Sequence, residues 1–330
     1  MKKGLKNKTF GATLAWLFAL FAVIASFGIG NMTQGNSIAS ALHSTFNVPT
    51  QISGVVITVL SLVIIVGGIK SISKVAEFIV PFMALFFVGG SVLILVWNCK
   101  VIPATFGRIF ACAFSKESVL GGTAGTAVIS FMTAMRMGVA RGVYTNEAGL
   151  GSSPIVAAAA KTNSCVKQGL ISMTSVFFTT IVVCTMTGLV VISSGLLDNS
   201  ELSGSILVTE AYNAGLPINI GTYLISFGLI FFAFTTILGW NYYGERCILY
   251  LTGTTKSIKP FKIIYILAIA IAPFMTLDPI WMLADITNAL MGIPNLIALL
   301  GLRKVVISET KKYFQAKETV VVAEGIQELG

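Results

Sequence analysis

Long apolar stretches without any charged residue recur along the whole chain. Residues 9–42, 44–69, 78–99, 118–135, 168–197 and 211–244 contain no Asp, Glu, Lys or Arg. A helix needs about 20 apolar residues to cross a bilayer, so each stretch accommodates one span. From 263 to 302 the apolar pattern is interrupted at Leu277-Asp278-Pro279, which is typical of a tight turn between two shorter helices. The pattern predicts an all-α transmembrane protein with spans at 11–42, 51–69, 75–98, 120–143, 168–195, 218–246, 261–277 and 279–302.

The composition supports this reading and excludes several others. Of the 330 residues, 55% are hydrophobic and 11% are charged, and the mean hydropathy is +0.88. A soluble domain carries about 25% charged residues, so a soluble chain is excluded. The five cysteines and the single histidine have no metal-binding spacing. The net charge of +9 does not indicate nucleic acid as a partner, because the basic residues flank the apolar runs and instead indicate a lipid bilayer.

The placement of the basic residues predicts the orientation of the spans. Cytoplasmic loops are enriched in Lys and Arg, and the basic loops here alternate with acidic or neutral ones. The loop 196–217 has three acidic residues and no basic one. Both termini are therefore predicted to be cytoplasmic in the plasma membrane. The loop 99–118, which carries Lys100, Arg108 and Lys116, breaks the alternation and is expected to lie along the membrane surface as an interfacial helix.

Polar residues inside two of the predicted spans suggest binding functions. Phe27, Asn31 and Gln34 share one helix face. Their two carboxamides could hydrogen-bond a small polar solute, or could bond neighbouring helices instead. Adjacent hydroxyls at Thr235 and Thr236 could join backbone carbonyls around Na⁺, or could bond back to their own helix. Trp240 is too deep for an interfacial residue and is expected to line a cavity.

The glycine-rich sequence of the fourth span allows two interpretations. Gly138 and Gly142 weaken helix continuity, and a helix broken between Arg136 and Gly142 would expose backbone groups that bind a carboxylate or a cation. Alternatively, the helix ends near Val143 and an ordinary glycine-rich loop follows.

Two further function classes lack support in the sequence. An intramembrane enzyme is not expected, because no HExxH, GxSxG or Cys/His pairing occurs. A passive channel is not expected either, because there are no charge rings and no repeated filter motif.

Three ordered motifs resemble the alanine-or-glycine:cation symporter family, the sodium:alanine symporters. They are Ala25-Ser-Phe-Gly-Ile-Gly-Asn-Met-Thr-Gln34, Gly138-Val-Ala-Arg-Gly-Val-Tyr-Thr-Asn-Glu-Ala-Gly-Leu-Gly-Ser-Ser-Pro154 and Thr236-Ile-Leu-Gly-Trp-Asn-Tyr-Tyr-Gly-Glu245. The resemblance implies sodium-coupled symport of a small neutral amino acid, with Na⁺ as the coupling ion and no other cofactor. It also favours the break near Arg136–Gly142. Carried over position by position, it implies substrate-binding roles for Gln34, Thr133, Gly138 and Trp240, and sodium-binding roles for Thr235 and Thr236.

The same resemblance implies a leucine-transporter (LeuT-type) bundle of two inverted repeats. On this basis residues 1–119 form a partial first repeat of three helices and an interfacial loop, residues 120–302 form a complete second repeat of five helices, and residues 303–330 form a cytoplasmic polar tail. The family's first broken helix has no counterpart before the first span, so we expect an N-terminally truncated member. The alternative function is then a transport-inactive fragment, or one half of a split symporter that pairs with a separate N-terminal fragment.

Overall fold

A computed structural model describes residues 1–114, 124–198, 202 and 204–327, and within these residues every regular element is helical. The start of the predicted span 120–143 lies outside this part. The first half contains α1 (Lys8–Phe27), η1 (Gly28–Met32), α2 (Thr33–Phe46), α3 (Thr50–Val66), α4 (Gly68–Trp97), α5 (Ile102–Phe114) and α7 (Ala124–Asn146). The second half contains α8 (Ser153–Ala157), α9 (Cys165–Val176), η2 (Phe177–Cys184), α10 (Thr185–Ser193), η3 (Leu196–Asp198), α11 (Gly204–Gly215), η4 (Pro217–Asn219), α12 (Ile220–Thr252), η5 (Thr255–Ser257), α13 (Ile258–Ile271), η6 (Ala272–Phe274) and α14 (Leu277–Gln327).

Six described helices are long and apolar enough to cross a membrane. They run over Lys8–Phe46, Gly68–Trp97, Cys165–Ser193, Pro217–Thr252, Thr255–Phe274 and Pro279–Gln315. A shorter apolar helix covers Thr50–Val66. The charge-free runs thus correspond to helices, and the all-α transmembrane class is confirmed, whereas the count of eight spans stays a prediction. The predicted interfacial loop contains α5, as expected of a helical segment there.

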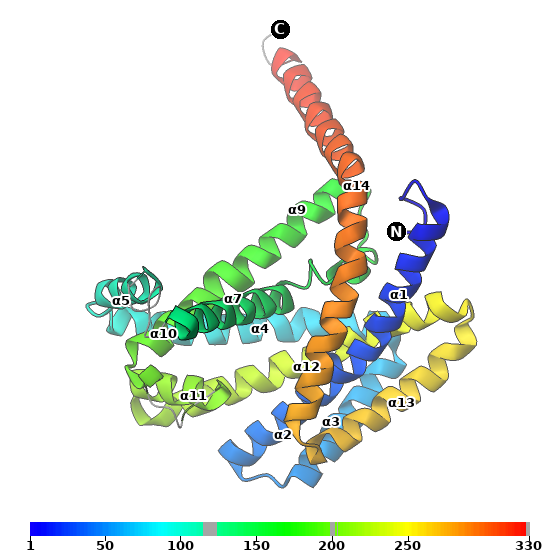
Figure 1. Ribbon diagram of the computed structural model, residues 1–330. Coiled ribbons are helices and arrows are strands. Elements are labelled where there is room, and N and C mark those ends of the chain that lie inside the picture. The colour runs from blue at the N-terminus through cyan, green and yellow to red at the C-terminus, as the bar shows by residue number, and fades with distance from the viewer. Residues whose placement is uncertain (115–123, 199–201, 203, 328–330) are drawn as a thin grey trace.

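The long helix α12 lies at the centre of the bundle. It packs against α1, α2, α4 and α11, while α14 runs along α1 (Figure 1). Glycines bring these helices close together: a Cβ on Gly30 would lie 2.1 Å from the Cβ of Trp240, and one on Gly244 would lie 2.4 Å from the ring of Phe261. The core therefore sits where α1, η1, α12 and α13 meet.

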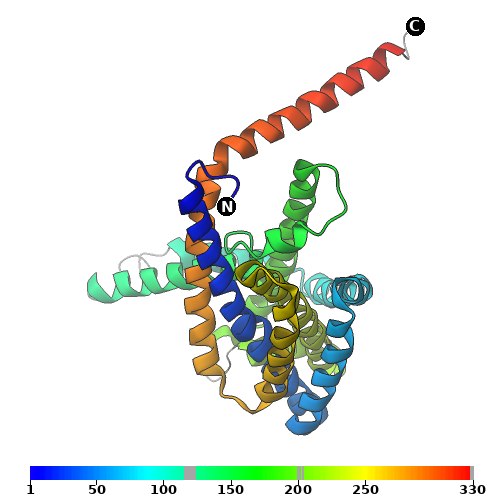
Figure 2. The ribbon, with the colours of Figure 1, turned by 90° about the vertical axis from the view of Figure 1, so that its right-hand side faces the viewer.

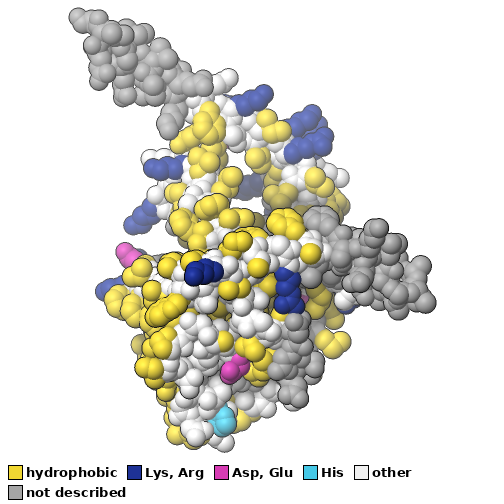
Figure 3. Space-filling view, turned by 90° about the vertical axis from the view of Figure 1, so that its left-hand side faces the viewer, with side chains coloured by type: hydrophobic (Ala, Val, Ile, Leu, Met, Phe, Trp, Pro, Cys, Tyr) yellow, Lys and Arg dark blue, Asp and Glu magenta, His cyan; other side chains and the backbone are white. Residues whose placement is uncertain are grey.

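The outer surface of the bundle is apolar, as expected of helices that face lipid. Phe78, Leu85 and Val66 are 80%, 77% and 71% exposed. Figure 3 shows Lys and Arg side chains gathered toward the end of the molecule from which the C-terminal helix projects. This separation of charge agrees with the sequence argument for a cytoplasmic face at that end, and the orientation of the termini remains a prediction.

The polar tail continues the last spanning helix. The 51 residues of α14 extend for about 75 Å, so the helix runs well past the predicted end of the span at residue 302. Its C-terminal part projects away from the bundle in two perpendicular views (Figures 1 and 2).

Two predictions about chain breaks are wrong. The segment Arg136–Gly142 is continuous helix within α7, because an α-helix tolerates interior glycine at a cost of only about 1 kcal/mol each. The break comes instead at Glu147, whose φ of 53° ends the helix. The turn expected at Leu277-Asp278-Pro279 lies earlier, at 272–276, and Pro279 occupies the first turn of α14, where its missing N–H has no helical partner to lose.

Candidate functional site

The first spanning helix widens into a π-helix at its centre. Over Gly28–Met32, the backbone N–H of Thr33 bonds the carbonyl of Gly28, five residues back. The Thr33 hydroxyl also donates to Gly28 and Ile29 carbonyls at 3.2 and 2.7 Å, and Gln34 Nε2 donates to the Ile29 carbonyl at 3.1 Å. Widened turns of this kind are frequent at functional sites, because they turn backbone carbonyls away from the regular ladder.

Asn31 and Tyr265 tie this widened turn to its neighbours. Asn31 Nδ2 donates to the Tyr265 carbonyl at 2.7 Å, and the Tyr265 hydroxyl lies 3.0 Å from the Gly30 carbonyl and 2.9 Å from the Ile237 carbonyl. Both side chains are fully buried. The hydroxyl proton can serve one carbonyl at a time, so Tyr265 of α13 connects α1 and α12 through an exchangeable bond.

Trp240 covers η1 from α12. The side chain is 2% exposed, rests on Gly30 and packs edge-on against Tyr243, with ring centroids 5.4 Å apart. Its Nε1 has no hydrogen-bond partner among the described residues, although it lies close enough to the Glu147 carboxylate to favour the charged form of that group. A buried N–H group without an acceptor destabilises the folded protein by about 1–3 kcal/mol, unless a ligand or water accepts a hydrogen bond from it.

Trp240 belongs to a wider set of buried polar atoms that lack partners in the described part of the chain. The set around η1, α12 and α14 comprises Asn31 Oδ1, Trp240 Nε1, both amide atoms of Asn241, and Asn288 Oδ1. Buried polar groups in folded proteins are almost always bonded to protein or to ordered water. These helices therefore have unused donors and acceptors in the interior of the bundle, which ordered water or a polar solute would satisfy.

The segment between α7 and α8 is held in a fixed shape beside Trp240. Asn295 Nδ2 donates to the carbonyls of Ala148 and Gly149 at 3.2 and 3.0 Å, and Ser152 Oγ donates to Glu147 Oε2 at 2.8 Å. Gly151 has a φ of 90° and packs so closely on Asn295 that a Cβ would lie 2.7 Å from its side chain. Only glycine satisfies both constraints at this position.

The structure brings two of the four expected substrate residues to this region. Trp240 approaches Glu147, and Gln34 interacts with the hydroxyl of Tyr144, so both contact the end of α7 and the segment after it. Thr133 and Gly138 lie on exposed parts of α7, and a Cβ on Gly138 would meet nothing within 4 Å. No described contact joins these two positions to Trp240.

Thr235 and Thr236 donate their protons within their own helix. Thr235 Oγ1 lies 3.0 Å from the carbonyls of Phe231 and Phe232, and Thr236 Oγ1 lies 2.8 Å from that of Phe232. This is the second of the two alternatives that the sequence left open. Their oxygen lone pairs remain available, because a hydroxyl that donates one bond can still accept.

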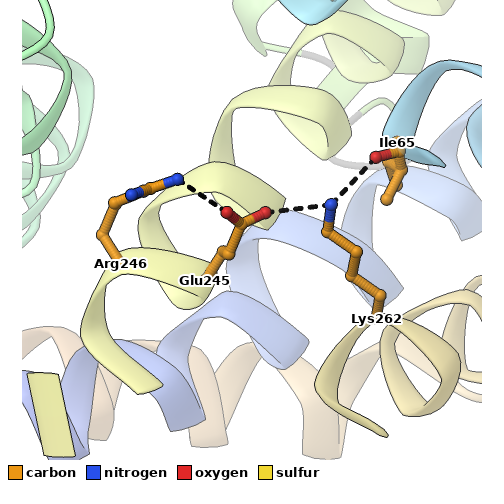
Figure 4. Close-up of polar contacts among 4 residues, drawn as sticks. All are labelled: Ile65, Glu245, Arg246 and Lys262. Carbon is orange, nitrogen blue, oxygen red and sulfur yellow. Dashed lines mark hydrogen bonds and ion pairs between the residues drawn. The ribbon is translucent and has the colours of Figure 1, made fainter. Parts of the chain in front are cut away.

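A charged junction fastens α12 to α13 and α3 at the basic end of the bundle (Figure 4). Glu245 accepts from Arg246 at 2.7 Å and from Lys262 Nζ at 3.1 Å, and Lys262 also donates to the Ile65 carbonyl at 3.0 Å. The Arg246 guanidinium stacks 4.9 Å above the ring of Tyr242. The Glu245 side chain is only 10% exposed and pairs with both of these cations.

Sequence reasoning missed Tyr265, Glu147 and Asn295. Tyr265 and Asn295 are separated from their partners by 234 and about 147 residues, and no local pattern reveals such contacts. Glu147 did carry a local signal: it is an ionisable residue directly after an apolar span and just before a glycine-rich turn.

A helical bundle with six candidate spans among its described residues defines a multi-pass membrane protein. Comparison with known proteins identifies the family. The chain matches the sodium:alanine symporter family over residues 1–324 and belongs to it.

Individual relatives agree with this assignment. An uncharacterized transporter of Haemophilus influenzae is 49% identical over 92% of this chain and 66% of its own length. The sodium/alanine symporter AgcS of Methanococcus maripaludis is 44% identical over 96% of this chain and 69% of its own length. The probable sodium/glutamine symporter GlnT of Bacillus subtilis is 33% identical over 96% of this chain and 64% of its own length.

The family match covers residues 1–324 and does not itself bear out the expected truncation. A separate N-terminal fragment is likewise not supported, and the inactive-fragment alternative is not favoured. The chain spans about two thirds of the length of the curated relatives it matches.

Proposed function

We propose that this protein carries out sodium-coupled symport of a small neutral amino acid, alanine or glycine, across the plasma membrane by alternating access. The observation that carries the proposal is the 44% identity, over 96% of the chain, to the Methanococcus maripaludis sodium/alanine symporter. The LeuT-type arrangement of two inverted repeats belongs to the same proposal. In that arrangement, binding sites lie near the bilayer midplane, where irregular helices expose backbone groups.

The proposed substrate site lies around η1 and Trp240, with Gln34 on the same widened helix. The polar groups offered to the substrate are the Gln34 carboxamide and the Nε1–H of Trp240, which also lies near the Glu147 carboxylate. Ile29, Leu150 and Ala284 pack with Trp240 in the buried core, so the surroundings proposed for the substrate side chain are apolar. Thr133 and Gly138 keep their proposed roles only if α7 approaches this site in another state of the transport cycle.

The proposed sodium site uses the oxygens of Thr235 and Thr236. Na⁺ is a hard cation that prefers oxygen ligands, as Ca²⁺ and Mg²⁺ do. Because both hydroxyl protons are already donated to the helix, the lone pairs of these oxygens can face a cation.

Equilibrium binding tests the proposal. Radiolabelled alanine and glycine should bind the purified protein in NaCl but not in KCl at the same ionic strength, while leucine should compete poorly. Binding that is indifferent to Na⁺, or that favours leucine, would refute the proposed coupling ion or the proposed substrate class.

A further inference from the structure

A cavity of about 370 Å³ lies beside the proposed substrate site but is not part of it. It is lined by the end of α7, by α8, by α9 with η2, and by Tyr243 of α12. Its polar lining includes Asn146, Glu147, Ser153, Gln168 and Ser172. The volume falls within the range of small-molecule sites and is far above the roughly 30 Å³ share of one water, so the cavity is sized for a small solute.

The cavity has one charged lining residue, and that residue has no counter-ion. Glu147 accepts a bond from Ser152 at 2.8 Å, and it makes no ion pair among the described residues. Glu245 shows the contrast, since it pairs with Lys262 and Arg246. A buried carboxylate without a cation is costly, and a cation arriving in the cavity would offset that cost.

Hydroxyl and carboxamide groups around Glu147 are still free to bind. Asn146 and Thr179 use their side chains in bonds to the protein. In contrast, Ser153, Gln168 and Ser172 make no side-chain hydrogen bond within the described part of the chain. An ammonium group has three donors, and one carboxylate with nearby hydroxyl oxygens satisfies them.

We propose that this cavity binds the ammonium group of the amino acid in transit, with Glu147 as its counter-ion. The inference rests on the proposed function and extends it to a second binding site, adjacent to Trp240. Lys161 precedes α9 and Lys167 lies in its first turn, so the cavity lies toward the side predicted to be cytoplasmic, where substrate is released. A Na⁺ ion alone would leave most of the volume unfilled. A small amino acid fills more of the cavity and brings an ammonium group to Glu147.

The electrostatic surroundings agree with this assignment. Glu147 lies in the connection after α7, and burial raises the pKa of its carboxyl above the ordinary value. The titratable groups near it are Tyr243 of α12 and Tyr144 of α7, while Arg141 and Asp285 act on Tyr144. A bound ammonium would favour the charged carboxylate, so ligand binding and proton release from Glu147 are coupled.

The test uses the full chain in detergent and compares ligands with and without an amino group. Glu147→Gln should weaken alanine binding at the cavity site about 10- to 100-fold, the effect of removing one partner of a charge-assisted bond. It should leave displacement by lactate, which has a hydroxyl in place of the amine, within about twofold. Glu147→Asp should retain most of the affinity, and Glu210→Gln, at an exposed acid outside the cavity, should change nothing.

A second variant covers the case in which Glu147→Gln does not fold. Ser172→Lys places a tethered ammonium in the cavity and should abolish the preference for alanine over lactate, whereas Thr174→Lys, on the same helix outside the lining, should not. Unchanged alanine affinity in both cavity variants would overturn the inference. A shift in Na⁺ affinity without a shift in alanine affinity would also overturn it, since the cation would then be Na⁺. If the unmodified protein does not bind alanine, the proposed function itself fails first.

Discussion

The close approach of Gly30 to Trp240 gives a sharp test of the contact between α1 and α12. In Gly30→Ala the new Cβ would lie 2.1 Å from Cβ and 2.3 Å from Cγ of Trp240. Cβ is fixed to the α12 backbone, so a rotation of the Trp240 side chain could move Cγ but could not relieve the clash with Cβ. The two helices must separate by more than 1 Å, since contacts between carbon atoms are optimal at about 3.5–4.0 Å.

The expected loss of stability in Gly30→Ala follows from overpacking of the core. Inserting a methyl group into a well-packed core costs about 1–3 kcal/mol, and the better helix propensity of alanine returns at most about 1 kcal/mol. The separation also moves Trp240 away from Glu147 and η1. Gly30→Ala should therefore lower the thermal unfolding midpoint and weaken alanine binding together.

Gly239→Ala is the matched control. It adds a methyl group at the residue next to Trp240, where the new group has free space around it. A Cβ at Gly239 would meet nothing within 4 Å. This variant should be as stable as the unmodified protein, or up to about 1 kcal/mol more stable, because alanine is the better helix former. Both midpoints are measured in detergent by fluorescence-detected thermal unfolding. A Gly30→Ala protein as stable as Gly239→Ala would refute the helix contact described here.

Four other predictions test separate parts of the account. Single cysteines replacing Lys161 and Glu210, in a background without native cysteines, should label from opposite sides of the membrane with an impermeant thiol reagent; labelling of both from outside would contradict the topology. Thr236→Val removes one oxygen at constant shape and should raise the Na⁺ concentration for half-maximal binding about 5- to 100-fold, with expression unchanged; an unchanged Na⁺ dependence would move the sodium site elsewhere. Lys262→Met leaves the sheltered Glu245 carboxylate with a single cation and should destabilise the protein by about 2–4 kcal/mol, whereas an unaltered unfolding midpoint would show that the junction contributes little. Alanine affinity should fall as the pH drops through the raised pKa of Glu147, because the protonated acid no longer pairs with an ammonium, and this pH dependence should be absent from Glu147→Gln.

The helices of this protein were largely predictable because the bilayer imposes a simple rule on sequence. Charge-free runs mark helices, and the predicted spans 168–195 and 218–246 correspond to α9–η2–α10 and to α12. Their ends were less predictable, because they depend on single residues. Gly67 and Gly68 separate α3 from α4 earlier than the charges suggested, and Pro279 begins a helix where a turn was expected.

The candidate site was predictable only where polarity stood out inside an apolar helix. Gln34 and Trp240 stand out in this way, and both lie beside the end of α7, while their substrate-binding roles stay a prediction. The continuous α7 shows the limit of composition, since glycine weakens a helix without fixing where it breaks. Tyr265 was missed because its partners come from distant parts of the chain.

Uptake into proteoliposomes tests the central claim most directly. Vesicles that contain the purified protein should concentrate radiolabelled alanine when an inward Na⁺ gradient is imposed. Collapse of that gradient with a sodium ionophore should release the accumulated alanine. Accumulation that persists without a Na⁺ gradient, or no accumulation by protein that is folded and binds alanine, would contradict sodium-coupled symport by this chain.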